Sequence, residues 1–153
     1  MPKVTYSSTA GLQQTTGAGV DLGGHALTNS KQIVVNLTGA GASVSLTSAQ
    51  TGAVIFWGGS NASTATLPAV SSGLRYTFVA ATAHAHVLNG GATVMNGQYL
   101  HSANKGTVAH VAISAKSSLT MHGTSAIGDR VDVWCDGTSW LVEGVVNNTI
   151  TQA

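Results

Sequence analysis

The chain has 153 residues, the length of one ordinary domain, and only 7% of them are charged, against about 25% in typical soluble domains. Its six Lys and Arg residues are scattered between Lys3 and Arg130, which excludes the clustered positive charge that a nucleic-acid backbone requires. No apolar stretch approaches the roughly 20 residues that cross a bilayer. We therefore expect neither nucleic acid nor a membrane as a partner.

The low charge also bears on self-association. Hydrophobic residues make up 43% of the chain, but aromatic residues make up only 5%. The formal net charge is +1, so little repulsion opposes association, and the Lys and Glu side chains that are depleted from protein interfaces are scarce. We expect a subunit of an oligomer or lattice. The alternative is a monomer with an uncharged polar coat.

Taken in chain order, the first part of the sequence differs from the rest. Residues 7–29 are rich in Gly, Thr, Gln and Ser and hold few large apolar residues, so they cannot bury enough surface to fold alone. We expect residues 1–30 to form an extended arm that becomes ordered against a neighbouring subunit or the body; the alternative is a disordered tail. The candidate residues of the arm for binding a capsid or a neighbouring subunit are Lys3, Val4, Tyr6, Leu12, Val20 and Leu22.

Residues 31–153 repeat the signals of short β-strands. Leu74, Tyr76 and Phe78 occupy alternate positions, the period of a half-buried strand. Turn residues separate such runs, at Asn89-Gly90-Gly91, Asn96-Gly97, Asn104-Lys105-Gly106 and Asp136-Gly137. The predicted strands are 33–37, 44–46, 52–57, 62–67, 74–81, 85–88, 108–114, 118–122, 130–135 and 140–146. Many short strands with turns about every 8–12 residues predict an all-β fold, an antiparallel β-sandwich of jelly-roll type.

The last two predicted strands form the clearest local signal. Residues 130–135 alternate in polarity, Asp136-Gly137 is a favoured tight-turn pair, and residues 140–146 return. Trp134 and Trp140 flank this turn, and we interpret both as core residues of the hairpin; the alternative is a sugar-binding platform. Cys135 is the single cysteine, so it forms no internal disulfide, and its apolar context indicates a small buried side chain.

The sequence offers little for catalysis. Sugar hydrolysis needs paired carboxylates, and most of the few acidic residues stand where Asp supports a turn or begins a strand. No Gly-x-Ser-x-Gly or phosphate-binding loop occurs. The acidic residues are Asp21, Asp129, Asp132, Asp136 and Glu143. We therefore predict that the protein is not an enzyme and binds no cofactor.

The histidines are the remaining candidates for chemistry. His84 and His86 are two residues apart, so on a strand they would share one face, and His101, His110 and His122 follow across the later strands. Imidazole suits Zn, Ni, Cu or Fe, and a His-x-His pair occurs in cupin metal barrels. The further Glu of that motif is missing here. We therefore predict no metal site, and interpret the histidines as lining a trimer axis or an exposed strand face.

Two segments carry a resemblance to a known family. They contain a Leu67-Pro68 turn followed by Gly73-Leu-Arg-Tyr-Thr-Phe, and a closing Gly128-Asp with Asp136-Gly-Thr-Ser-Trp140. These motifs, spread over residues 66–146, resemble a β module of tailed-bacteriophage virion proteins, which is found in capsid decoration (cement) proteins and in some tail-fibre heads.

The resemblance implies a jelly-roll-like body, a homotrimer, and attachment to the major capsid protein between capsomers on the virion exterior, after synthesis in the host cytoplasm. It also implies that binding the expanded shell stabilises that state. The sequence has no coiled-coil heptads, which favours a decoration protein over a fibre. The alternative is a tail-fibre or spike head that recognises a host glycan, with Trp57 or Trp140 as the stacking residue.

Overall fold

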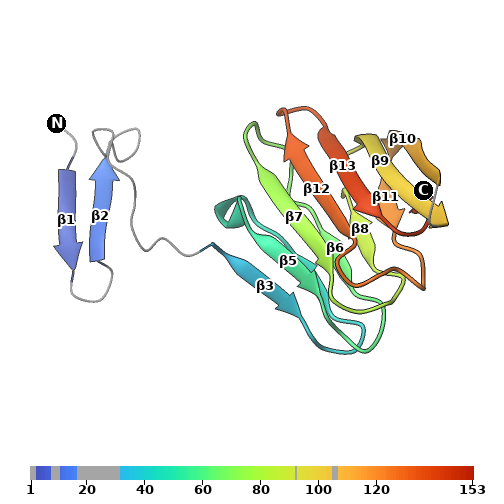
Figure 1. Ribbon diagram of the computed structural model, residues 1–153. Helices are drawn as coiled ribbons and strands as arrows, with labels where there is room; N and C mark the ends of the chain where they lie inside the picture. The colour runs from blue at the N-terminus through green and yellow to red at the C-terminus, as the bar shows by residue number, and fades with distance from the viewer. Residues whose placement is uncertain (1–2, 8–10, 17–31, 92, 105–106) are drawn as a thin grey trace. The chain divides into compact units, whose positions relative to one another are not determined.

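Figure 1 shows a computed structural model of the chain, which describes residues 3–7, 11–16, 32–91, 93–104 and 107–153. The chain divides into two units, Met1–Lys31 and Gln32–Ala153. In the first unit, β1 (Lys3–Ser7) pairs antiparallel with β2 (Gly11–Thr16). The expected arm is therefore not a single extended segment over these residues, because two of its parts pair with each other.

The second unit contains two β-sheets, which confirms the predicted β-sandwich. A 3-10 turn, η1 (Ser48–Gln50), lies between β4 (Ser43–Ser45) and β5 (Val54–Trp57) in the chain. In spatial order, the seven-stranded sheet comprises β10 (Thr107–Lys116), β9 (Met95–Asn104), β13 (Trp140–Val146), β12 (Arg130–Cys135), β7 (Arg75–Ala80), β5 (Val54–Trp57) and β3 (Val34–Leu37). The five-stranded sheet comprises β14 (Thr151–Gln152), β11 (Ser118–Thr120), β8 (Val87–Asn89), β6 (Thr64–Thr66) and β4 (Ser43–Ser45).

The sheets are mixed, which corrects the expectation of purely antiparallel, jelly-roll pairing. From β3 to β8 the chain passes from one sheet to the other after every strand. Each return therefore runs in the same direction, so β3, β5 and β7 are parallel neighbours, as are β4, β6 and β8. This winding resembles a turn of a β-solenoid. Later strands add antiparallel pairs, of which β12–β13 is the predicted hairpin with its predicted bounds.

Strand β9 was missed because Asn96-Gly97 indicates a turn when it is considered alone. Both residues lie inside β9, which pairs with β10 on one side and with β13 on the other. Gly97 has a φ of +145°, and a Cβ placed on it would lie 2.0 Å from the carbonyl oxygen of Val142 in β13. The glycine thus permits a close approach of two backbones, which is one of the common reasons for a glycine inside a strand.

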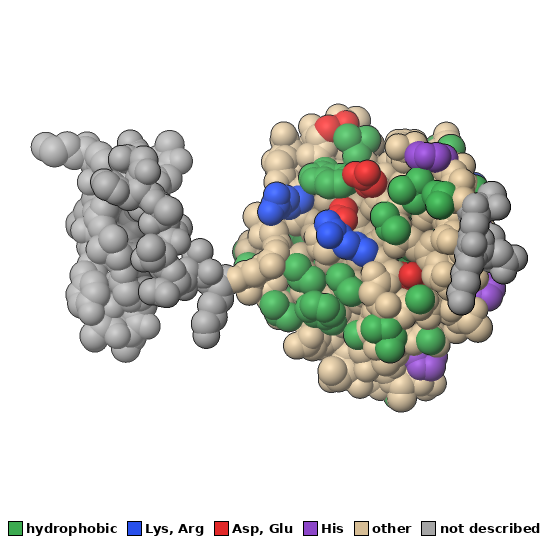
Figure 2. Space-filling model, viewed as in Figure 1, with side chains coloured by type: hydrophobic (Ala, Val, Ile, Leu, Met, Phe, Trp, Pro, Cys, Tyr) green, Lys and Arg blue, Asp and Glu red, His purple; other side chains and the backbone are tan. Residues whose placement is uncertain are grey.

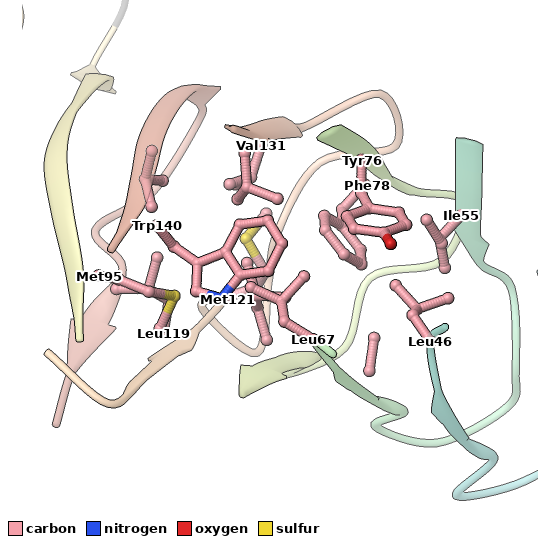
Figure 3. Packing of buried hydrophobic residues seen from close by; sticks show 14 of the residues in the cluster. Leu46, Ile55, Leu67, Tyr76, Phe78, Met95, Leu119, Met121, Val131 and Trp140 are labelled. Atoms are coloured by element: carbon pink, nitrogen blue, oxygen red, sulfur yellow. The ribbon is translucent and has the colours of Figure 1, made fainter. Parts of the chain in front are cut away.

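The core lies between the two sheets. Figure 3 shows side chains of both sheets pointing into this space, among them Trp140, Tyr76 and Phe78. All three are at most 1% exposed, and the rings of Tyr76 and Trp140 have their centroids 5.9 Å apart. Burying a large apolar side chain of this kind contributes roughly 1.5–3 kcal/mol each. The predicted alternation of β7 is confirmed, since Leu74, Tyr76 and Phe78 all face the core.

Candidate functional site

The outer face of the seven-stranded sheet, turned toward the viewer in Figure 2, carries several charged side chains next to hydrophobic ones. In β12, alternate residues are buried in the core, so Arg130, Asp132 and Trp134 face outward. The neighbouring strands add Arg75 from β7 and Glu143 from β13. We call these five residues the outer-face cluster. Because β12 is the central strand and is paired on both sides, the cluster lies away from the edges of the sheet.

Asp132 is the fixed centre of this cluster. Its Oδ2 accepts a hydrogen bond from Arg130 Nε at 2.5 Å, and its Oδ1 accepts one from Thr77 Oγ1 at 2.6 Å. The hydrogen bond and the negative charge of Asp132 raise the pKa of Arg130, so the guanidinium stays charged. Asp132 stands directly across from Glu143 on β13. Among the described residues, neither the Glu143 carboxylate nor the Arg75 guanidinium has a hydrogen-bond or ion-pair partner.

Trp134 is 39% exposed and does not belong to the core, which corrects the prediction made from its place beside the turn. The register pairs Trp140 with Cys135, and both face inward, so Trp134 must face outward with its cross-strand partners Arg75 and Leu141. Its indole borders three shallow hollows of about 150, 300 and 480 Å³. The outward ring is therefore available to a ligand.

The other two tryptophans are unsuited to ligand stacking. Trp57 is 1% exposed and Trp140 is fully buried, which corrects their assignment as candidate sugar-stacking residues. Trp57 lies instead in a stack inside the core, with the ring of Phe78 at 5.2 Å and the ring of His86 at 5.4 Å. Trp140 is the hairpin core residue of the pair, and Trp134 is the exposed one.

His86 has a structural role that the sequence did not reveal. Its Nδ1 accepts a hydrogen bond from the Ser63 N–H at 3.1 Å, and its Nε2 lies 3.1 Å from the Thr82 carbonyl oxygen, to which it donates. Both ring nitrogens of the neutral imidazole are thus engaged. Burial lowers the pKa of His86 and keeps it neutral. No lone pair is left for a metal, and His84 is its edge-on neighbour with a ring distance of 5.9 Å.

Two further carboxylates support the backbone. Asp129 is buried, and its two oxygens accept hydrogen bonds from the N–H groups of Ala126 and Asn147, so it joins the loop before β12 to the end of β13. Burial raises the pKa of Asp129 against the lowering effect of these two hydrogen bonds. Asp136 accepts from the Thr138 and Ser139 N–H groups in the hairpin turn, which lowers its pKa.

The remaining candidates are placed as follows. Lys3, Val4 and Tyr6 lie in β1 and Leu12 lies in β2, whereas Val20 and Leu22 fall outside the described residues. Within the described part of the chain, no three His, Cys, Asp or Glu side chains gather to hold a metal ion. Over the same residues, no helix has the length and apolar character needed to cross a membrane.

Comparisons with known proteins return no match. No protein-family model matches the chain, and neither a curated protein nor a solved structure matches it.

The outer-face cluster was missed because its residues come from three strands. The period of residues 130–135 alone places Arg130, Asp132 and Trp134 on one face, opposite Val131 and Val133. That signal was present in the sequence and places Trp134 outside the core. The arrival of Arg75 beside Trp134 depends on the pairing of β7 with β12, which no local pattern states.

Proposed function

We propose that the protein is a structural subunit that assembles with copies of itself, as a bacteriophage capsid decoration protein does. The observation that carries this proposal is the character of the two edges of the seven-stranded sheet. A free strand edge invites pairing with another chain, and monomeric proteins protect such edges with charged residues or proline. Neither protection is present along β3, and β10 carries a single Lys at its end.

Within the described part of residues 32–153, no strand pairs with the outer edge of β3. The carbonyl oxygens of Ile33 and Leu37 accept hydrogen bonds from Val54 and Gly58, on the side of β5. Backbone groups alternate along a strand, so those of Val34 and Asn36 point to the free edge. The Val34 side chain is 51% exposed and that of Ile33 is 42% exposed. This edge offers both hydrogen bonds and apolar surface to a neighbour.

At the opposite edge, β10 exposes apolar surface near its start and is partly covered near its end. Val108 is 62% exposed there, and one backbone oxygen, that of Ala112, is already occupied by the Gln152 side chain at 3.0 Å. Pairing the β3 edge of one copy with the β10 edge of the next is a head-to-tail contact, which closes into a ring when the rotation allows. A homotrimer, as the family resemblance implies, is one such ring.

The oligomeric state of the purified chain tests this proposal. We expect light scattering coupled to gel filtration to give a trimer, and Val34→Lys to shift it toward monomer by placing a charge on the β3 edge. Ile127→Lys is the matched control, because Ile127 is 78% exposed in a loop outside both edge strands. A wild-type monomer, or equal effects of the two variants, would overturn the proposal.

The proposal that the assembled subunits attach to a capsid is more specific and rests on the family resemblance. In virions produced with and without the chain, we expect regular additional density over the heads only when the chain is present, with greater heat resistance of those particles. A version lacking residues 1–30 should lose shell binding if the arm makes that contact. Heads that look and melt alike with and without the chain would contradict the decoration role.

A further inference from the structure

We propose that the outer-face cluster is a binding site for a neutral saccharide, with Trp134 as the stacking residue. The inference goes beyond the assembly role and does not depend on it, because the cluster lies at the centre of the sheet and the proposed contacts lie at its edges. The sequence left the Trp134–Trp140 pair and Trp57 as alternatives for sugar binding, and of these three side chains Trp134 is the one that is exposed.

The exposed indole gives the site its apolar surface. One face of a pyranose ring presents C–H groups, which pack on an aromatic ring as other apolar groups do. Trp134 borders all three hollows, so sugar units on either side of the ring would touch it. Leu141, its cross-strand partner, and Val145 are 44% and 62% exposed and extend the apolar floor. A chain of sugar units fits this row of hollows better than a single compact ligand.

The polar groups around the indole match the hydroxyl rim of a sugar. The first hollow is lined by Arg75, Arg130 and Asp132, and the third by Gln98 and Glu143. A guanidinium offers only donors and a carboxylate only acceptors, whereas a hydroxyl accepts and donates, so it suits both. Hydrogen bonds between a sugar hydroxyl and an ionised side chain are stronger than those between two neutral groups.

The balance of charge selects a neutral ligand. Two arginines and two carboxylates share the cluster, so it has no net charge to attract an anion. Arg130 is already bound to Asp132, and Glu143 lies directly across from Asp132, where it would repel an acidic sugar or a phosphate. The two carboxylates also argue against a protein partner here, because Asp and Glu are depleted from protein interfaces.

The site is held in place before any ligand binds. Asp132 holds Arg130 and Thr77, and the strand that carries both Asp132 and Trp134 is paired on both sides. A rigid strand positions side chains more accurately than a loop, and binding then costs less conformational entropy. Asp132 therefore offers an oriented carboxylate to hydroxyl groups, while the Glu143 carboxylate, which has no partner among the described residues, is free to accept from them.

Tryptophan fluorescence tests the proposal directly, because Trp134 is the exposed tryptophan and the other two are buried. The full chain is screened on an array of neutral glycans, and the methyl glycosides and oligosaccharides that bind are titrated while acrylamide quenching is measured. We expect the sugar to protect Trp134 from acrylamide. Trp134→Ala and Glu143→Gln should each weaken binding at least tenfold, while Val108→Ala, on the β10 edge, should leave it unchanged.

Circular dichroism of each variant checks its fold, and Glu143→Gln keeps the test valid should Trp134→Ala unfold. No binding of any neutral glycan, binding of acidic glycans alone, or protection that survives Trp134→Ala would overturn the proposal. Protection that grows with protein concentration in the absence of sugar would also overturn it, because a second copy would then cover the face. Light scattering on the same samples reports the assembly role separately.

Discussion

Adding one methyl group at Gly97 should destabilise the protein strongly. In the folded chain the new Cβ would lie 2.0 Å from the carbonyl oxygen and 2.8 Å from the nitrogen of Val142, and both are backbone atoms that cannot rotate away. Reaching the 3.0 Å that real Cβ atoms keep requires β9 and β13 to separate by about 1 Å, against a pairing that runs from Trp140 to Val146. The φ of +145° adds strain for any residue with a side chain.

The two costs can be put in numbers. Overpacking costs roughly 1–3 kcal/mol, and a positive φ in a residue with a Cβ costs about 1–2 kcal/mol. We therefore expect Gly97→Ala to lower the free energy of unfolding by about 2–5 kcal/mol, a large share of the 5–15 kcal/mol typical of a domain. With a urea dependence of about 2 kcal/mol per molar, in the middle of the usual range, the unfolding midpoint should fall by roughly 1–2.5 M.

Urea unfolding followed by tryptophan fluorescence measures this change. Gly123→Ala is the matched control, because nothing lies within 4 Å of its added Cβ and its φ is not positive, so its midpoint should stay close to wild type. If the two alanine variants unfold at the same urea concentration, the close approach of β9 to β13 is refuted, and with it the account of why Asn96-Gly97 lies inside a strand.

Three further predictions use the same measurement. Trp140→Ala should cost about 3–5 kcal/mol, because it empties part of the core, and Trp134→Ala less than about 1 kcal/mol; similar losses would contradict their placement. The pKa of His86 is lower in the folded state than in the unfolded state, so on acidification the imidazole is protonated in the unfolded state at a higher pH than in the folded one. The free energy of unfolding should therefore decline as pH falls below about 6.5, by at most about 1.4 kcal/mol per pH unit. His86→Gln should weaken this decline, whereas His110→Gln, at an exposed site, should not. Identical pH profiles of the free energy of unfolding for the two variants would refute the role of His86. Asp129→Ala leaves two N–H groups without their acceptor and should cost about 1–3 kcal/mol, more than Asp129→Asn, which keeps one oxygen; equal losses would show that the second hydrogen bond adds nothing.

The candidate site shows how far local patterns reach. The alternation of residues 130–135 contains the outward position of Trp134, yet the neighbouring turn suggested a core pair, which the register of Cys135 with Trp140 excludes. His86 is similar. Its spacing from His84 suggested a shared strand face, but β8 begins only at Val87, and the ring turns into the core to bind Ser63 and Thr82.

The sequence by itself determined the all-β class, most of the strands and the residues that each strand turns inward, because the two-residue period of a strand is a local property of the backbone. The tertiary structure alone decided which strands are neighbours and in which direction they run. It placed β3, β5 and β7 in parallel and put Arg75 beside Trp134, 59 positions apart in the chain. Such contacts follow from the order in which the strands pair and from packing one sheet on the other. Those are long-range conditions, and no window of neighbouring residues contains them.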